Sequence, residues 1–228
     1  MTTKSLAAVQ TEPGGLLKVE EVIIPEVGED QALVKLFSSG VCHSQLHQME
    51  SETAARPLVL GHEGTGVVVK VGSRVRHLKE GDHAIVTWVQ RYPGRGAIAP
   101  SKSGVSYRGE PVNGNVYTWA EDVLVNAEYV VGISKEYPTD VSCIVGCAVL
   151  TGAGAVLHSA KVRPGESVAV FGVGGVGLCS IQMAAILEAY PIIAVDLKDD
   201  KLELAKQFGA THVVNASHTD PITAIHEI

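Results

Sequence analysis

The pattern of hydrophobic and polar residues divides the chain into two parts. Up to about residue 135, short valine-rich runs alternate with polar residues and stop at glycine or proline. Such runs are typical of β-strands joined by turns. Strands are predicted in 16–25, 31–40, 64–73 and 81–89. The first part is therefore predicted to be a small β-barrel or sandwich, with a glycine- and proline-rich surface loop from Arg91 to Asn115.

From about residue 165, strand-like runs alternate with helical patterns. Strands are predicted in 166–172, 191–196 and 211–216, and helices in 174–189 and 199–210. Strand–helix repetition at this spacing indicates a parallel sheet with right-handed crossovers. The fold class is therefore α/β with a β-rich part, and residues 141–162 are predicted to form a helical connector.

The last nine residues predict the start of one more helix. Asp220 stands at the cap and Pro221 in the first turn, and Ile222, Ile225 and Ile228 have the spacing of a core face.

Composition and charge exclude several classes of protein. Hydrophobic residues make up 46% of the chain, which favours a globular fold over disorder. The net charge of −7 argues against nucleic acid or an anionic membrane as a partner. No apolar run is long enough to span a bilayer, and the first ten residues lack the core of a secretion signal. The four cysteines are too few and uneven for a disulfide framework, so we expect reduced thiols in a cytoplasmic protein.

A glycine-rich turn is the strongest motif in the second part. Residues 172–177 read G-x-G-x-x-G between a predicted strand and a predicted helix. The first glycine permits the tight turn, the second lets a pyrophosphate approach, and the third lets helix and strand pack closely. Free N–H groups at the helix start face the phosphates. The predicted phosphate contacts are Gly172, Gly174, Gly175, Val176 and Gly177.

Asp196 ends the second predicted strand of this part, about 20 residues beyond the glycines. An acid there accepts hydrogen bonds from an adenosine ribose, and its charge repels a 2′-phosphate, so NAD is favoured over NADP. The alternative is a glycine-rich turn without a ligand. The register of strand, helix, second strand and terminal acid favours nucleotide binding.

A second cluster of candidate residues lies between residues 38 and 50, where Cys42, His43 and His47 fall within six positions. They form no self-contained zinc module, because such modules need four ligands in two pairs. Further ligands must come from elsewhere, and His62 and Cys147, each beside a glycine, are the candidates. Taken singly, each of them has a competing interpretation as a core cysteine or a solvated histidine.

These motifs together resemble a known family. "GVCHSQLH", "GHEGTGVVVKVG", "GDHAI", "VGCAVLTG" and "VAVFGVGGVGL" follow one another as in the zinc-dependent medium-chain alcohol dehydrogenases. The resemblance implies a GroES-like catalytic domain over residues 1–150 and the first half of an NAD-binding Rossmann domain over 151–228. It also implies an NAD-dependent oxidoreductase acting on an alcohol, or in reverse on an aldehyde or ketone.

The resemblance implies a role for individual residues, carried over position by position. Cys42, His62 and Cys147 would hold one catalytic zinc, which lowers the pKa of an alcohol as a Lewis acid. Ser44 would take the alcohol proton, and His47 would release it to solvent; a direct zinc contact from His47 is the alternative. The other residues implied at the site are His43 at the pyrophosphate, Glu63 beside the zinc, Trp88 in the pocket wall, Thr151 near the nicotinamide and Lys201 near the ribose.

The sequence departs from the family pattern in three ways. No cysteine lies between Cys42 and Cys143, so we expect no structural zinc. Gln45 stands where the family usually has an aspartate behind the metal; an amide accepts a hydrogen bond but adds no charge. The chain ends inside a predicted helix, from which we expect the N-terminal part of a longer, homo-oligomeric enzyme, inactive on its own.

Two other functions compete with the alcohol dehydrogenase hypothesis. One is a non-catalytic fragment that binds zinc or a nucleotide only for structure, and the other is a zinc-free quinone reductase of the same fold. The combined presence of metal ligands and a proton relay favours the dehydrogenase, while the sequence does not specify the alcohol.

Overall fold

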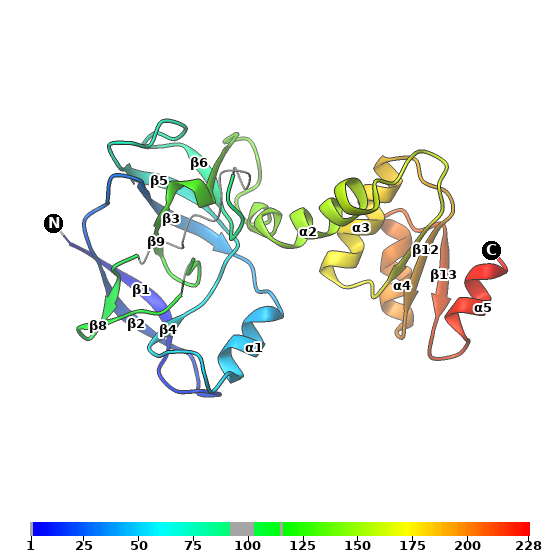
Figure 1. Ribbon diagram of the computed structural model, residues 1–228, viewed down its shortest axis with the longest axis horizontal. Coiled ribbons are helices and arrows are strands. Elements are labelled where there is room, and N and C mark those ends of the chain that lie inside the picture. The colour runs from blue at the N-terminus through cyan, green and yellow to red at the C-terminus, as the bar shows by residue number, and fades with distance from the viewer. Residues whose placement is uncertain (1, 92–102, 115) are drawn as a thin grey trace. The chain divides into compact units, whose positions relative to one another are not determined.

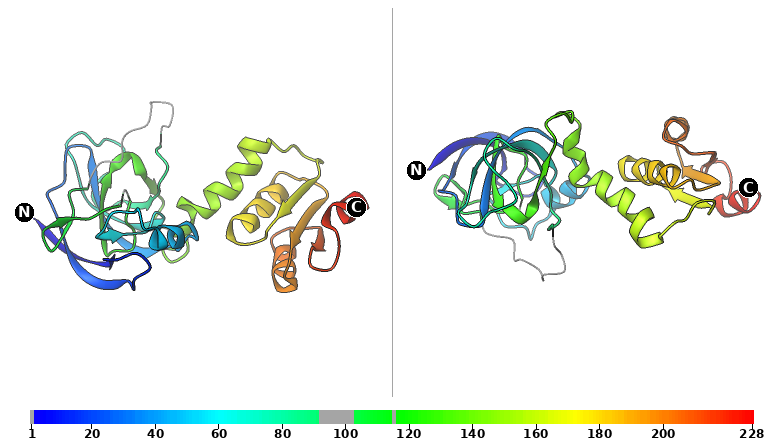
Figure 2. Two further views of the ribbon diagram at one scale, coloured as in Figure 1. Left: turned by 60° about the horizontal axis from the view of Figure 1, so that its bottom comes forward. Right: turned by 90° about the horizontal axis from the view of Figure 1, so that it is seen from above.

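The computed structural model describes residues 2–91, 103–114 and 116–228. It divides into two compact units, unit 1 (Met1–Cys147) and unit 2 (Ala148–Ile228). Figures 1 and 2 show that strands dominate unit 1, whereas unit 2 alternates strands and helices. The fold class predicted from the sequence is confirmed.

Unit 1 is built from two antiparallel sheets. The first has the order β4 (Leu58–Val59), β1 (Thr3–Gln10), β2 (Lys18–Ile24), β7 (Ser106–Tyr107) and β8 (Glu110–Pro111). The second has the order β10 (Val130–Ile133), β6 (His83–Val86), β5 (Gly64–Val71), β3 (Gln31–Ser39) and β9 (Asp122–Asn126). The described residues of unit 1 also form the short helical segments α1 (Ser44–Glu50), η2 (Ala127–Tyr129) and η3 (Ser142–Gly146).

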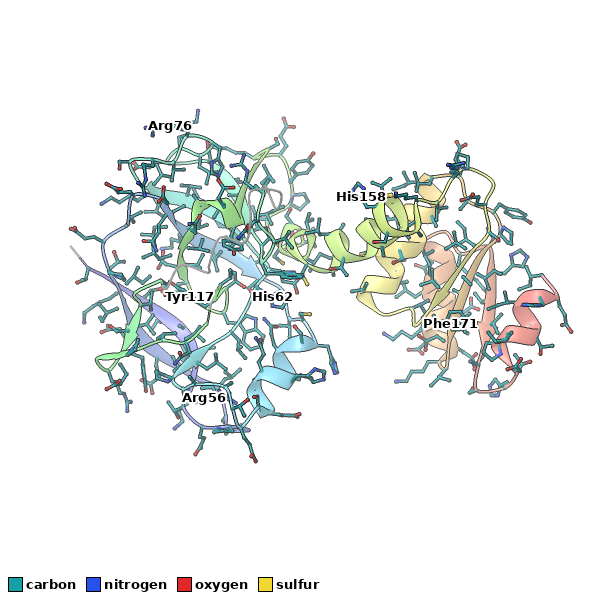
Figure 3. The ribbon with its side chains drawn as sticks, viewed as in Figure 1. Arg56, His62, Arg76, Tyr117, His158 and Phe171 are labelled. Carbon is teal, nitrogen blue, oxygen red and sulfur yellow. The ribbon has the colours of Figure 1, made fainter. Side chains whose placement is uncertain are left out.

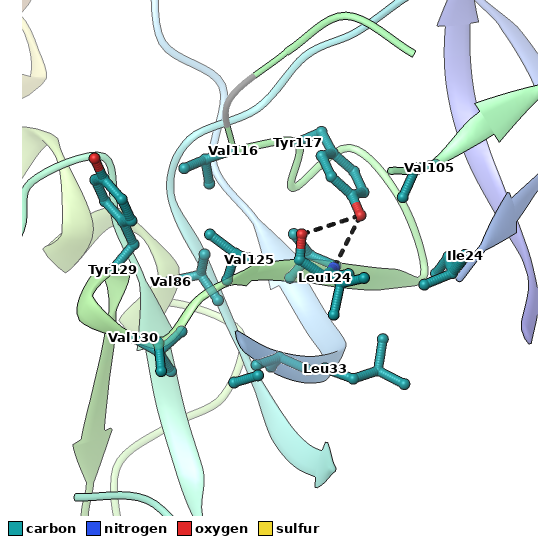
Figure 4. Close-up of a cluster of buried hydrophobic side chains, with 14 of the residues drawn as sticks. Ile24, Leu33, Val86, Val105, Val116, Tyr117, Leu124, Val125, Tyr129 and Val130 are labelled. Carbon is teal, nitrogen blue, oxygen red and sulfur yellow. Dashed lines mark hydrogen bonds between the residues drawn. The ribbon is translucent and has the colours of Figure 1, made fainter. Parts of the chain in front are cut away.

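The core of unit 1 is made of valine, leucine and isoleucine side chains from both sheets, packed around Tyr117 (Figure 4). The Tyr117 side chain is fully buried. Its hydroxyl accepts a hydrogen bond from the Leu124 N–H at 2.9 Å and donates to the Leu124 carbonyl at 3.3 Å. Burial raises the pKa of this phenol well above its ordinary value, so it stays neutral and holds β9 in place.

The expectation of a surface loop from Arg91 to Asn115 is wrong for residues 106–111. These residues form the hairpin of β7 and β8, which joins the first sheet through a pair between Ile23 and Ser106. Val105 and Tyr107 are buried. This alternation of buried and exposed residues covers too few positions to be recognised in a sequence rich in glycine and serine. Residues 92–102 and 115 of the expected loop lie outside the described residues.

Unit 2 begins with a helical stretch and continues as a parallel sheet. Its elements in chain order are α2 (Ala148–Gly154), the π-helical turn η4 (Ala155–Ala160), β11 (Val168–Phe171), α3 (Gly175–Ile186), β12 (Ile192–Asp196), α4 (Asp199–Gln207), β13 (His212–Asn215) and α5 (Pro221–His226). The strands pair in the order β11-β12-β13, all parallel. The strands and helices expected from the sequence are all present.

Helix α5 begins as predicted but buries less than predicted. Asp220 caps it, since its carboxylate accepts a hydrogen bond from the Thr223 N–H at 2.8 Å. Ile225 packs beside Val214, but Ile222 and Ile228 are exposed, because only one side of this short helix meets β13. Of the three isoleucines predicted to form a core face, only Ile225 packs against the sheet.

No helix within the described residues is long and apolar enough to cross a membrane.

Candidate functional site

Three metal-binding side chains of unit 1 come together in the structure. One donor atom each of Cys42, His62 and Cys147 lies within 4.8 Å of the others. His62 Nε2 and Cys147 Sγ are 3.3 Å apart; His62 is labelled in Figure 3. This donor group does not include His47. We call these three residues the donor cluster.

Cys42 is held by a turn that leads from β3 into α1. Its backbone N–H donates to Oε1 of Gln45 at 2.8 Å, and the Gln45 N–H donates back to the Cys42 carbonyl at 3.1 Å. The Gln45 side chain is fully buried, so this reciprocal pair fixes the turn away from water. Gln45 thus supports the donor cluster through the backbone of Cys42.

Cys147 is positioned by the close approach of η3 to β6. The buried Thr87 hydroxyl donates to the Gly146 carbonyl at 2.6 Å. A Cβ on Gly146 would lie 2.9 Å from the Val86 carbonyl oxygen, so only glycine permits this approach. Sequence reasoning missed Thr87, although a threonine between a valine-rich strand and Trp88 was a visible signal.

Glu63 lies beneath the turn that carries Cys42. Its side chain is 2% exposed and packs against Gly40, where an added Cβ would lie 2.6 Å from the carboxyl carbon. The Gly40 N–H donates to the Glu63 carbonyl at 2.9 Å. Gly40, which the sequence analysis did not single out, makes room for the acid.

The charges around the cluster favour a bound cation. Burial, followed by the charges of Cys42 and Glu63, raises the pKa of Cys147 to about 11, and the Trp88 indole N–H opposes this shift. Burial also lowers the pKa of His62, which keeps its imidazole neutral. A metal ion selects a neutral imidazole and a thiolate, and a nearby positive charge favours the ionised form of the Cys147 thiol.

The distance between His62 and Cys147 fits zinc. Tetrahedral bonds of ordinary zinc–sulfur and zinc–nitrogen length place the two ligand atoms about 3.5 Å apart. The observed 3.3 Å between His62 Nε2 and Cys147 Sγ is close to that value. Two cysteines and one histidine also match a catalytic zinc site, which keeps its fourth position open.

The two side chains predicted to move protons, Ser44 and His47, are both exposed on α1, and two other predicted site residues lie near them. Ser44 begins α1, and its hydroxyl donates to Cys42 Sγ at 3.3 Å, so it touches the donor cluster. His43 and His47 are exposed, with their rings edge to face at 5.4 Å. Trp88 is 54% exposed and contacts the cluster through the Cys147 thiol.

The glycine turn of unit 2 contains two kinds of glycine: some are required by the backbone conformation or packing, and others are not. Gly172 has φ +83°, and a Cβ on Gly177 would lie 2.0 Å from the Gly172 carbonyl oxygen. Neither condition applies to Gly174 or Gly175, where a Cβ would meet no atom within 4 Å. The start of α3 therefore faces open space, with helix N–H groups that have no partner inside the helix. This arrangement fits a phosphate group.

Asp196 bridges β12 and the glycine turn. One carboxylate oxygen accepts from the Val173 N–H at 2.9 Å, and the other accepts from Leu197 at 2.7 Å and Lys198 at 3.1 Å. The Val173 bond is the main cause that lowers the pKa of Asp196, and the charge of Lys201 adds to it. Asp196 is therefore an ionised residue that shapes the turn, in addition to any contact with a ribose.

Thr151 is exposed on α2, next to a glycine that packs tightly. A Cβ on Gly152 would lie 2.3 Å from the Val176 carbonyl oxygen, and the Ser180 hydroxyl donates to the Gly152 carbonyl at 3.1 Å. Helix α2 is thus pressed against α3 just behind the glycine turn, and this contact orients Thr151.

Comparison with known proteins agrees with this geometry. Residues 28–135 match the alcohol dehydrogenase GroES-like domain, and residues 175–228 match the zinc-binding dehydrogenase family. An S-(hydroxymethyl)glutathione dehydrogenase of Escherichia coli is 36% identical over 241 aligned residues, which cover 95% of this chain. The alignment covers 65% of the relative, so the chain spans about two thirds of that protein's length.

Solved structures give the same result. An alcohol dehydrogenase zinc-binding domain protein from Burkholderia ambifaria superposes with a TM-score of 0.93 at 33% identity, covering 100% of this chain and 68% of that one. Benzyl alcohol dehydrogenase from Acinetobacter calcoaceticus superposes with a TM-score of 0.89 at 32% identity, covering 99% and 67%. With both domain types matched in order and the donor cluster assembled, the chain belongs to the zinc-dependent medium-chain alcohol dehydrogenase family.

Proposed function

We propose that the protein is an oxidoreductase that transfers a hydride between a small alcohol and NAD, with a zinc ion held by Cys42, His62 and Cys147. The observation that carries the proposal is the meeting of these three donors, from distant segments, at distances that suit zinc. When bound, zinc supplies a Lewis acid that lowers the pKa of an alcohol.

The chain itself supplies a route for the proton. Ser44 Oγ lies 3.3 Å from Cys42 Sγ, which puts the hydroxyl within reach of an alcohol at the donor cluster. We propose that this hydroxyl relays the proton: its oxygen accepts the alcohol proton as its own O–H proton passes on towards solvent. His47 lies one turn further along α1 and is exposed, so its imidazole is placed to pass that proton to water.

The glycine turn supplies the cofactor site. NAD accepts the hydride when bound, and the protein orients it. The open space at Gly174 and Gly175 leaves room for a pyrophosphate against the start of α3. The ionised Asp196 at the end of β12 would accept hydrogen bonds from a ribose and repel a 2′-phosphate.

The substrate class follows from the family and from two relatives. One relative carries the name of an S-(hydroxymethyl)glutathione dehydrogenase and another that of a benzyl alcohol dehydrogenase. We therefore propose a primary alcohol as substrate, and NADH formation with ethanol, benzyl alcohol and S-(hydroxymethyl)glutathione separates the classes.

Zinc content tests the metal site directly. Cys147→Ser should lose most of the zinc, whereas Cys179→Ser should keep it, because Cys179 lies on α3 in unit 2, outside the donor cluster. Elemental analysis of both variants and the wild-type protein measures the ratio of zinc to protein. Equal zinc content in the two variants would contradict the assignment.

Cofactor preference tests the role of Asp196. Asp196→Asn removes the charge but keeps an acceptor oxygen, so the preference for NAD over NADP should narrow by about 1–3 kcal/mol. Asp200→Asn, an exposed change in the first turn of α4, is the control. Fluorescence titrations with both cofactors measure the preference, and the same ratio in all three proteins would refute the role.

A further inference from the structure

The C-terminal end of α1 is held by one arginine. Arg56 Nη2 lies 3.2–3.3 Å from the carbonyl oxygens of Gln48, Met49 and Ser51. Its Nη1 donates to the Ala54 carbonyl at 2.7 Å. Within the part of the chain that the structure describes, the hydrogen-bond partners of the Arg56 guanidinium are all backbone carbonyls, and it forms no ion pair. The guanidinium therefore ties the end of α1 to the loop that follows it.

The end of α1 needs such an anchor. At seven residues α1 is too short to be stable in water by itself. The last carbonyls of a helix have no partner inside the helix and carry partial negative charge, which a cation offsets. Two further donors converge on the same end, since the Gly14 N–H and Gln10 Nε2 reach the Met49 carbonyl at 2.8 and 3.2 Å.

Arg56 also connects two segments that carry metal donors. Helix α1 directly follows Cys42 and begins with Ser44, whereas Arg56 stands at the start of the segment that passes through β4 to His62. Gln45 fixes the first end of α1 to the Cys42 backbone, and Arg56 fixes the last end to the His62 segment.

We propose that Arg56 is a positioning residue for the donor cluster: its planar guanidinium anchors α1 and thereby sets Cys42 and Ser44 relative to His62. Lysine cannot replace it, because a single ammonium does not reach carbonyls on both sides of the loop as the guanidinium fork does. The proposal rests on the proposed zinc site, but the anchoring of α1 is measured without metal.

The first test is hydrogen exchange of residues 44–50. Arg56→Met keeps an apolar stem but removes every donor. In this variant and in Arg56→Lys, the α1 amides should exchange about tenfold or more faster than in the wild-type protein. Arg76→Met is the matched control, because Arg76 also donates to local carbonyls, those of Ser73 and Val75, and lies on the far side of unit 1 from α1 (Figure 3). It should leave the exchange of α1 unchanged.

The second test places cobalt(II) at the donor cluster and reads its visible spectrum. The thiolate and d–d bands report the positions of the ligands and need no catalytic turnover. Arg56→Met should shift these bands and weaken cobalt binding about tenfold, since changes behind metal ligands typically cost 10- to 100-fold in affinity. Arg76→Met should match the wild-type protein in both respects.

Each outcome decides the proposal. Unchanged exchange in Arg56→Met, or full protection in Arg56→Lys, overturns the anchoring role of the fork. Faster exchange with an unchanged cobalt spectrum overturns the positioning role. If Arg56→Met does not fold by circular dichroism, Arg56→Lys gives both readouts. A wild-type protein that binds no cobalt contradicts the proposed zinc site, and the positioning role of Arg56 then fails with it. The hydrogen-exchange data still test the anchoring of α1 by Arg56, because they do not depend on metal.

Discussion

Gly177→Ala tests whether the glycine turn is built as the structure indicates. The added Cβ would lie 2.0 Å from the Gly172 carbonyl oxygen, whereas ordinary contacts begin at 3.4 Å. Helix α3 would have to move away from β11 by more than about 1 Å, and backbone atoms cannot rotate aside. Overpacking costs about 1–3 kcal/mol, and we expect the upper end here. The better helix propensity of alanine offsets about 1 kcal/mol, which leaves a net loss of about 2 kcal/mol.

Thermal and urea denaturation measure this loss. For a chain of this size, about 2 kcal/mol corresponds to a fall in Tm of about 4–8 °C. Gly174→Ala is the matched control, because a Cβ at Gly174 meets no protein atom within 4 Å. It should leave stability nearly unchanged yet weaken NAD binding about tenfold or more, since the methyl group enters the space proposed for the pyrophosphate.

The two variants separate structure from ligand binding. A Gly177→Ala protein as stable as the wild type would refute the packing argument. A Gly174→Ala protein that binds NAD normally would refute the placement of the cofactor.

Three further predictions concern other parts of the molecule. Tyr117→Phe should lower the free energy of unfolding by about 1–3 kcal/mol, because the buried Leu124 N–H loses its acceptor; urea denaturation measures it, with exposed Tyr137→Phe as control. Gln45→Ala should weaken zinc binding about 10- to 100-fold, because the Cys42 N–H loses its buried acceptor. Competition with a chelator measures the zinc affinity, with exposed Gln48→Ala as control, and equal affinities in the two variants would refute the role of Gln45. The pKa of Asp196 is held below its ordinary value, so its contribution to stability is complete above the unfolded pKa near 4 and is lost as pH falls through the lower folded pKa; Asp196→Asn should flatten the acid limb of the stability curve, and an unaltered limb would count against that.

The sequence predicted unit 2 in detail because its signals are local. The three parallel strands are short apolar runs, although only β12 is largely buried in the structure. Gly172 and Asp196 stand where β11 and β12 end, and Gly209 follows the end of α4. Both Gly172 and Gly209 have positive φ, as a tight turn and a helix end require.

Unit 1 was harder to predict because its decisive contacts are not local. The alternation in β1 is interrupted by buried polar residues, such as Ser5, whose hydroxyl donates to the Asp122 carboxylate of the other sheet at 2.9 Å. Helix α1 was not predicted, because it is short and polar and its end is held by Arg56 and Gln10 from other segments. A pattern of single residues carries no information on such contacts.

The donor cluster shows the same division. The resemblance indicated Cys42, His62 and Cys147, but not what places them. Thr87, Gly146 and Gly40 act through a hydroxyl bond and through the absence of a side chain, and these are visible only when the packed segments are seen together.

The long separation of the donors has a consequence for how the protein matures. His62 and Cys147 are 85 residues apart, and in an unfolded chain a loop of that length seldom brings its ends together. Small zinc modules, whose ligands are close in sequence, fold around the ion. In this protein, hydrogen bonds of Gln45 and Thr87 position Cys42 and Cys147 without the help of a metal ion. Metal should therefore enter unit 1 after its strands have formed, and during synthesis the site becomes complete only once residue 147 has left the ribosome.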